Sequence, residues 1–340
     1  MKHLDDAGLD ARQLRALGAV MGALVGDAAG GILEFMGRAP TQQEVDEAMQ
    51  MPGGGVFELA PGQFTDDGEM TVSLVRALLA AKGAYRPELA ALNYCEWESS
   101  RPFDIGMATR AALGVPLAKS QTPTQVLKLV QAQALEHNAE SKANGSLMRA
   151  SPLGIAACGC SEEEAIALAL ADAQLTHPNP SCQHSTAAYV LALRHLMLSP
   201  GDNAGAIFAA QAYVQVQSKE VSAWLSDAVS GHLPDAFPMA GFVRYGFTYA
   251  FHYLHSGASF ERAITETLLR GGDTDTNACI VGGLMGAYHG LHGLPKLALG
   301  GVLSCNTQFG QRRPDIFTVI PVMHNLTLLS QYCLSTRSAS

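Results

Sequence analysis

Two short segments of the sequence concentrate side chains with hard oxygen ligands. The first, Thr65-Asp66-Asp67-Gly68-Glu69, combines three carboxylates with a hydroxyl. Taken alone it is typical of a helix start, because acids in a first turn complement the helix dipole and Asp66 with Glu69 would form a cap. The second, Gly271-Gly272-Asp273-Thr274-Asp275-Thr276-Asn277, alternates acids and hydroxyls after two glycines. Oxygens at this spacing can converge on Mg²⁺ or Mn²⁺.

Two familiar motifs do not explain the second segment. An EF-hand loop beginning at Asp273 would need glycine where the chain has Ala278 and glutamate where it has Leu284. A phosphatase motif, Asp-x-Asp-x-Thr, would need a preceding buried strand, whereas residues 260–270 have a helical pattern. We therefore expect the two segments to face each other and to hold paired cations ~3.5–4 Å apart. Such a pair can clamp vicinal hydroxyls and activate water for hydrolysis.

The elements that must position these segments have helical patterns. Gly22, Gly26 and Gly30 recur every four residues in an apolar stretch, which predicts close contact with another helix. Ser161 and Glu164 form a capping box. No segment shows sustained two-residue alternation bounded by turns, so we predict an all-α fold in a single domain. The expected helices cover residues 14–29, 71–82, 165–175, 185–197, 203–217, 243–255, 260–270 and 277–289.

Composition excludes several classes of protein. The 340 residues are 48% hydrophobic and 16% charged, as in soluble globular proteins, and the net charge of −9 argues against a nucleic-acid binder. No stretch reaches the ~18 apolar residues of a membrane span, and residues 1–15 lack the apolar core of a signal peptide. The seven cysteines include no Cys-x-x-Cys pair, which favours buried thiols in a reducing compartment. We expect a cytoplasmic protein that binds neither nucleic acid nor membranes.

The chain resembles the ADP-ribosylglycohydrolase family, which includes the hydrolase that reactivates ADP-ribosylated dinitrogenase reductase. The resemblance implies a single compact orthogonal helical bundle over residues 1–340, with 1–13 as an N-terminal extension. Residues 296–340, including Gln311-Arg312-Arg313-Pro314, match nothing in the family and are expected to pack over the bundle or contact a partner. The matching segments lie at residues 26–30, 34–35, 64–67, 103–106, 144–149, 176–178, 241–243 and 271–276.

The resemblance also implies roles for particular residues. Two divalent ions, Mg²⁺ or Mn²⁺, would hold the 2′- and 3′-hydroxyls of the ribose whose anomeric carbon is attacked. Glu34 or Asp67 would act as the general base that accepts the proton of the attacking water. His177 would contact ribose or diphosphate, although a histidine before proline often just ends a helix, and Phe242 would stack on adenine. The expected metal ligands are Thr65, Asp66, Asp67, Asp273, Asp275 and Thr276. The expected substrate contacts are Asp104, Asn144, Gly145, Ser146, Met148, His177 and Phe242.

Asp104 bears on the linkage that is cleaved. Family members that hydrolyse arginine-linked ADP-ribose have an aspartate in this Asp-Ile-Gly segment, where a carboxylate pairs with guanidinium. Read without the family, Asp104 would equally well start a turn or cap a helix. Met107 replaces the polar residue often found just after the segment, which affects finer substrate contacts. The implied activity is removal of ADP-ribose from arginine side chains of modified proteins.

Two other readings compete with arginine hydrolysis. One is a hydrolase of serine-linked ADP-ribose or O-acetyl-ADP-ribose. The other is an immunity protein that binds and blocks an ADP-ribosylating toxin, in which case a tight complex would survive loss of both Asp66 and Asp67. Comparing the cleavage of arginine-linked and serine-linked ADP-ribosyl peptides distinguishes the two enzymatic hypotheses.

Overall fold

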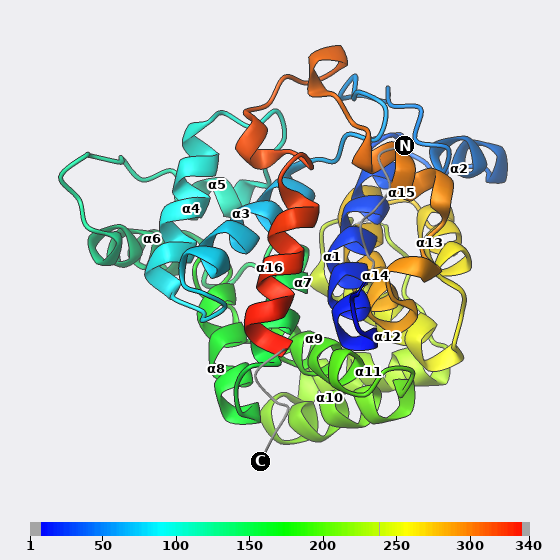
Figure 1. The fold of residues 1–340 in the computed structure, drawn as a ribbon. Coiled ribbons are helices and arrows are strands. Elements are labelled where there is room, and N and C mark those ends of the chain that lie inside the picture. Colours follow the sequence, from blue (N-terminus) through cyan, green and yellow to red (C-terminus); the bar gives the residue numbers. More distant parts are fainter. Residues whose placement is uncertain (1–7, 238, 335–340) are drawn as a thin grey trace.

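The described residues of the computed structural model, 8–237 and 239–334, form helices joined by turns, with two isolated β-bridges and no strand (Figure 1). The prediction of an all-α fold is confirmed. No helix in this part of the chain has the length and apolar character needed to span a membrane. The α-helices are α1 (Ala11–Gly30), α2 (Gln42–Ala48), α3 (Asp66–Ala80), α4 (Pro87–Ser99), α5 (Met107–Leu113), α6 (Pro123–Asn138), α7 (Ser151–Ala157), α8 (Glu162–Ala173), α9 (Pro180–Leu198), α10 (Asn203–Gln217), α11 (Lys219–Ser230), α12 (Val243–Ser256), α13 (Phe260–Leu269), α14 (Thr274–His289), α15 (Lys296–Leu303) and α16 (Val322–Leu334). The short 3-10 helices are η1 (Leu291–Gly293), η2 (Thr307–Phe309) and η3 (Asp315–Phe317).

Helices α1 and α14 pack against each other at the centre of the bundle (Figure 1). A Cβ on Gly22 would overlap the carbonyl oxygen of Gly282, and one on Gly26 would overlap that of Ala278. The predicted close helix contact is therefore present, and the two backbones touch directly. Gly30, at the end of α1, lies against the backbone of Asp275, so this antiparallel contact brings the end of α1 to the start of α14.

Gly26→Ala is expected to lower the free energy of unfolding by about 1–3 kcal/mol, because the added methyl group forces two packed helices apart. Gly300→Ala in α15 is the matched control. A Cβ there meets nothing within 4 Å, so we expect a gain of about 0.5–1 kcal/mol from the better helix former. Urea denaturation of both variants measures the difference. Equal effects would show that the α1–α14 contact does not need glycine.

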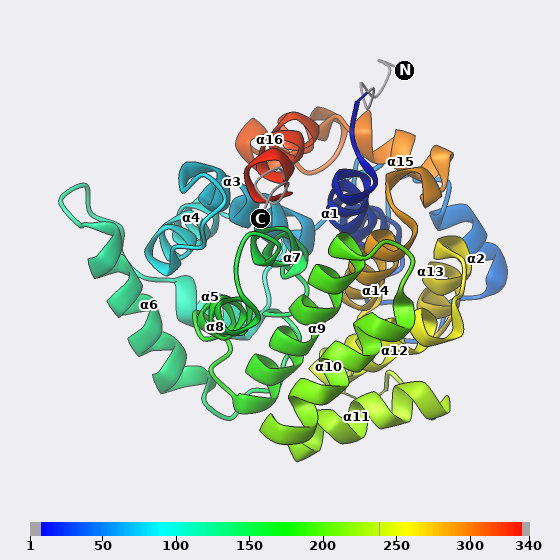
Figure 2. The same ribbon diagram turned by 60° about the horizontal axis from the view of Figure 1, so that its bottom comes forward.

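The other helices surround this central pair. α9, α10 and α11 lie together on one side, where α9 contacts α1 and α14 directly and α12 lies between α11 and α14. α4, α5 and α6 extend away on another side (Figure 2). α16 packs against α1, α3 and α7. The described part of the unassigned C-terminal segment thus packs over the bundle, one of the two outcomes expected for it. Residues 335–340, and residues 1–7 of the N-terminal extension, lie outside the described residues.

Two helix boundaries differ from prediction in a way that concerns function. α3 begins at Asp66 instead of residue 71, and α14 begins at Thr274 instead of residue 277. The acidic segments therefore form the first turns of these helices, so each helix extends further towards the N-terminus than its apolar period predicted. The capping box of Ser161 and Glu164 at the start of α8 is confirmed.

Candidate active site and metal centre

The two acidic segments meet where α3 and α14 begin. Thr65 and Asp273 immediately precede these helices, and neither side chain makes a capping hydrogen bond. Instead, the Thr65 hydroxyl lies 3.4 Å from Asp275 Oδ2, and the Thr276 hydroxyl donates to Asp67 Oδ2 at 3.3 Å. The interpretation of residues 65–69 as an ordinary cap is therefore wrong. The oxygens of Thr65 and Asp67 lie against the other segment, about two hundred residues away in the chain.

The carboxylates form two overlapping groups. Oxygens of Asp27, Asp67 and Asp275 lie within 4.8 Å of one another, and so do oxygens of Glu34, Asp273 and Asp275. Asp67 Oδ1 is buried and has no hydrogen-bond partner. Buried carboxylates with an orphan oxygen fit hard divalent cations, because the cation's charge compensates for lost hydration. The acidic groups could therefore hold metal ions.

Burial raises the pKa of three acids in the first turns of α3 and α14. For Asp66, Asp67 and Asp275 the pKa lies well above its usual range, first because of burial and second because neighbouring carboxylates repel the charged form. A bound cation would act in the opposite direction, since nearby positive charge favours a carboxylate. Cation binding at these residues is therefore coupled to proton release.

Asp27 holds the first acidic segment in place. The backbone N–H and the hydroxyl of Thr65 each donate to Asp27 Oδ1 at 2.9 Å, and the Gly68 N–H donates to Oδ2 at 2.7 Å. Burial raises the pKa of Asp27 to about 7, although these hydrogen bonds oppose the shift. We assigned Asp27 no role from sequence. Asp27 is the only charged residue in the apolar stretch 16–30, a signal that could identify it because an unpaired charge is rarely buried.

Glu34 lies just beyond α1, at the edge of the acidic cluster. Its Oε2 accepts hydrogen bonds from the Thr274 N–H at 2.8 Å and the Thr274 hydroxyl at 2.7 Å. Burial, followed by repulsion from Asp273, raises the pKa of Glu34 to about 7. A carboxyl group with this pKa can both accept and release a proton near neutral pH, as a general base requires.

A cavity of about 620 Å³ opens above the acidic cluster. This volume lies in the range of small-molecule binding sites. Asn144 supports the wall, because its side-chain amide donates to Asp273 Oδ2 at 2.8 Å. Ten of the fourteen residues predicted for the site line the cavity: Glu34, Asp66, Asp104, Asn144, Gly145, Met148, His177, Asp273, Asp275 and Thr276.

Four predicted residues do not line the cavity. Thr65 and Asp67 are buried within the acidic cluster behind the wall. Ser146 is fully buried and lies 3.3 Å from the Thr186 hydroxyl. Phe242 packs edge-on against Trp224 and Tyr245, with ring centroids 5.5 and 5.6 Å away. The structure therefore places Ser146 and Phe242 outside the residues that line the cavity, and the substrate contacts expected of them remain predictions. A bridge between the backbones of Ala143 and Phe242 leaves Gly241, not the Phe242 ring, on the wall.

Asp104 lies in the loop between α4 and α5, on the cavity wall. Gly106 occupies the cap position of α5, so Asp104 does not cap this helix. The Ile105 N–H donates to Asp104 Oδ1 at 2.9 Å, and the Asp104 carboxyl group also interacts with the side chain of Asp66. Burial raises the pKa of Asp104, and the hydrogen bond from Ile105 partly offsets this effect. Met107, which follows, lines the mouth and is 90% exposed.

His177 is buried beside Thr176 and Arg149. The Thr176 hydroxyl accepts from Arg149 Nη1 at 2.8 Å and lies 2.8 Å from His177 Nδ1. When the Thr176 hydroxyl donates to Nδ1, Nε2 carries the ring proton. Burial, then repulsion from Arg149, lowers the pKa of His177 to about 3. Arg149 is itself held by a buried ion pair with Asp172.

The fold and the site together define a helical protein whose binding cavity ends on a buried acidic cluster. The sequence model of the ADP-ribosylglycohydrolase family matches residues 9–318, and the chain belongs to this family.

Individual relatives agree with this assignment. The chain is 28% identical to the ADP-ribosyl-dinitrogen reductase glycohydrolase of Rhodospirillum rubrum, over 83% of this chain and 88% of that protein. It is 31% identical to the ADP-ribosylarginine hydrolase Tri1 of Pseudomonas putida, over 46% of this chain and 50% of that one. A solved structure titled ADP-ribosylglycohydrolase-related protein complex superposes with a TM-score of 0.72 and 24% identity, over 96% of this chain and 100% of that one. The structural match concerns the fold alone.

Proposed function

We propose that the protein is a metal-dependent hydrolase that removes ADP-ribose from arginine side chains of modified proteins. The observation that carries the proposal is the position of Asp104, partly buried on the cavity wall beside the acidic cluster. A planar guanidinium is the natural partner of a carboxylate in such a position. The similarity to an ADP-ribosylarginine hydrolase supports this choice of linkage.

Two divalent cations, Mg²⁺ or Mn²⁺, would be held by the oxygens of the two segments. The unpartnered Asp67 Oδ1 and the sharing of Asp275 between the two acidic groups support a pair of ions. When bound, the cations would neutralise the carboxylates and bind the vicinal hydroxyls of the ribose. The proposed ligands are Thr65, Asp66, Asp67, Asp273, Asp275 and Thr276.

The remaining side chains supply proton handling and binding. Water attacks the anomeric carbon, and the carbon–nitrogen bond breaks with its electron pair leaving on the guanidine. The proton that water loses ends on the guanidine. Glu34, whose pKa is raised to about 7, accepts the proton from water. Asp104 pairs with the guanidinium group and stabilises its departure, and His177 donates from Nε2 to an oxygen of the ADP-ribose. Asn144, Gly145 and Met148 contact the substrate from the opposite wall.

ADP-ribose release from an ADP-ribosylarginine peptide tests this function. We expect turnover with Mg²⁺ or Mn²⁺, and a loss of about 10³-fold or more in chelator, because metal ions contribute several kcal/mol to such reactions. A serine-linked peptide of the same sequence is the control and should be cleaved much more slowly. Turnover that chelator leaves unchanged contradicts metal dependence, and faster cleavage of the serine linkage contradicts the assignment to arginine.

A further inference from the structure

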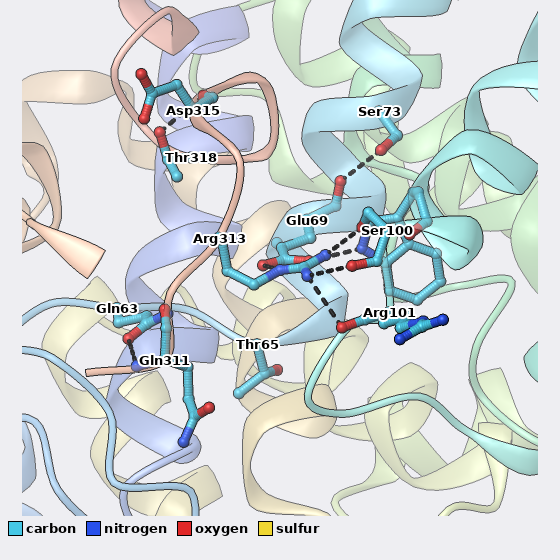
Figure 3. Close-up of polar contacts among 12 residues, drawn as sticks. Gln63, Thr65, Glu69, Ser73, Ser100, Arg101, Gln311, Arg313, Asp315 and Thr318 are labelled. Carbon is cyan, nitrogen blue, oxygen red and sulfur yellow. Dashed lines mark hydrogen bonds and ion pairs between the residues drawn. The ribbon is translucent and has the colours of Figure 1, made fainter. Parts of the chain in front are cut away.

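Residues 310–318, which we call the strap, cross the outer side of α3 at its first turns (Figure 3). Gln311 fastens one end of the strap. Its N–H donates to Gln63 Oε1 at 3.1 Å, and the Gln63 side-chain amide donates back to the Gln311 carbonyl at 2.6 Å. Gln63 precedes Thr65 by two residues, so these hydrogen bonds join the strap to the segment that leads into the acidic cluster.

Arg313 is the most heavily bonded residue of the strap. Its side chain is 3% exposed and that of Glu69 is 2% exposed. Nε and Nη2 donate to the two carboxylate oxygens of Glu69 at 2.7 and 2.8 Å. Nη2 also donates to Ser100 Oγ at 2.7 Å, and Nη1 donates to the carbonyls of Ser100 and Arg101, both at 3.1 Å (Figure 3). These bonds use all five N–H groups of the guanidinium.

The partners of Arg313 lie next to the candidate site on both sides. Glu69 follows Asp67 by two residues in α3, and Arg101 precedes Asp104 by three. Arg101 has a φ of 57°, a left-handed conformation that a non-glycine residue adopts only when its surroundings enforce it. The Arg313 bond to the Arg101 carbonyl is such a constraint. One guanidinium thus ties the loop that carries Asp104 to the helix that begins the acidic cluster.

We infer that the strap, through Arg313, positions Asp104 for the departing guanidine, which makes Arg313 a positioning residue outside the cavity. The inference rests on the proposed role of Asp104. Stability alone is a poor explanation of the arrangement, since a buried ion pair contributes little compared with apolar side chains of similar size. Two bonds to successive carbonyls, in contrast, fix the path of the loop. A displacement of about 1 Å can reduce turnover about 100-fold.

Arg313→Lys separates the charge of Arg313 from its geometry. A lysine ammonium still neutralises Glu69, but it lacks the fork that reaches both carbonyls. We expect the variant to fold and to bind Mn²⁺ with wild-type affinity by calorimetry. Its kcat on ADP-ribosylarginine peptide should fall about 10–100-fold, with little change in KM. Arg312→Lys, the same change one residue away, is the control and should remain within about twofold.

If Arg313 acts by positioning Asp104, the fall in kcat caused by Arg313→Lys should depend on Asp104. In an Asp104→Asn background, we expect Arg313→Lys to lower the remaining turnover by less than about twofold, because the group that it positions is already lost. The same fold-loss in both backgrounds overturns the inference, and so does wild-type turnover of the single variant. Loss of Mn²⁺ binding by Arg313→Lys also overturns the inference. Arg313 would then position the proposed metal ligands in α3 instead of Asp104. If the wild-type protein cleaves no arginine linkage, the proposed function fails first, before the strap is tested.

A paired variant covers the case in which Arg313→Lys does not fold. Glu69→Met combined with Arg313→Met replaces the buried ion pair with apolar side chains of similar length, a change that proteins commonly tolerate. It also removes every bond to the carbonyls of Ser100 and Arg101. Its kcat on the arginine linkage should therefore fall at least as far as in the lysine variant. Wild-type kcat in this folded double variant contradicts the inference.

Discussion

Asp275→Asn is expected to abolish ADP-ribose release and at the same time to stabilise the metal-free fold. Asp275 belongs to both acidic groups, so its loss weakens the proposed cation site as a whole. We expect turnover to fall by about 10³-fold or more. In chelator, however, the buried charge has no compensating cation, and removing it relieves repulsion with Glu34 and Asp67. The shape is retained, since the amide keeps the oxygen that accepts from the Thr276 N–H.

The gain in stability should depend on pH. The pKa of Asp275 is raised in the folded protein, so the native state binds more protons than the unfolded state. Its free energy of unfolding therefore decreases as pH rises above the unfolded pKa of about 4. The asparagine variant lacks this penalty, and its advantage in chelator should grow from pH 5 to pH 8, reaching at least about 1 kcal/mol.

Thermal denaturation with and without Mn²⁺ measures both effects. Mn²⁺ should raise the Tm of the wild-type protein and leave that of Asp275→Asn unchanged, because only a ligand that binds the native state stabilises it. Asp46→Asn, the same change at an exposed site, is the control for activity and stability. An Asp275→Asn variant that is active, or that Mn²⁺ still stabilises, would rule out the proposed metal centre.

Much of the helical scaffold was predictable because its cause is local. Each of the eight helices expected from apolar periodicity is present, and residues 203–217 match α10 at both ends. The glycines of α1 also predicted a close helix contact, since only a side chain of one hydrogen allows backbones to touch. The sequence could not say that α14 is the partner, because that pairing joins segments far apart in the chain.

Local preference predicts less where tertiary contacts compete with it. Thr65 has the residue type of a cap, yet its hydroxyl donates to Asp27 and lies 3.4 Å from Asp275 Oδ2 instead of capping the helix. Phe242 has the residue type for stacking, and the structure packs its ring edge-on against Trp224 and Tyr245, which the sequence does not indicate. Arg313 gave no local signal at all. Its partner Glu69 is 244 residues away, and only the folded chain shows that the segment around Arg313 supports the site. The expectation that residues 296–340 match nothing in the family is wrong up to residue 318, where the family model ends.

Asp104→Asn is expected to convert an arginine-selective enzyme into one with little preference for the linkage. A neutral amide cannot form the bidentate charged pair with guanidinium, and charge-assisted bonds are roughly twice as strong as neutral ones. Loss of such a contact at the leaving group should lower kcat/KM for the arginine linkage about 10²–10³-fold, equivalent to about 3–4 kcal/mol. Asp104 interacts with Asp66, but every proposed metal ligand is retained and the asparagine can still form a hydrogen bond, so Mn²⁺ binding should persist.

The serine-linked peptide makes this result interpretable. Its leaving group is a neutral hydroxyl with no guanidinium to pair, so we expect Asp104→Asn to change kcat/KM for this slow substrate by less than about threefold. Equal losses on both linkages would mean that Asp104 acts on the shared ADP-ribose, for example by orienting water, and would remove the basis for arginine selectivity. An unequal loss assigns Asp104 to the leaving group. It also separates Asp104 from Asp275, whose replacement must suppress both linkages alike because the ribose is common to them.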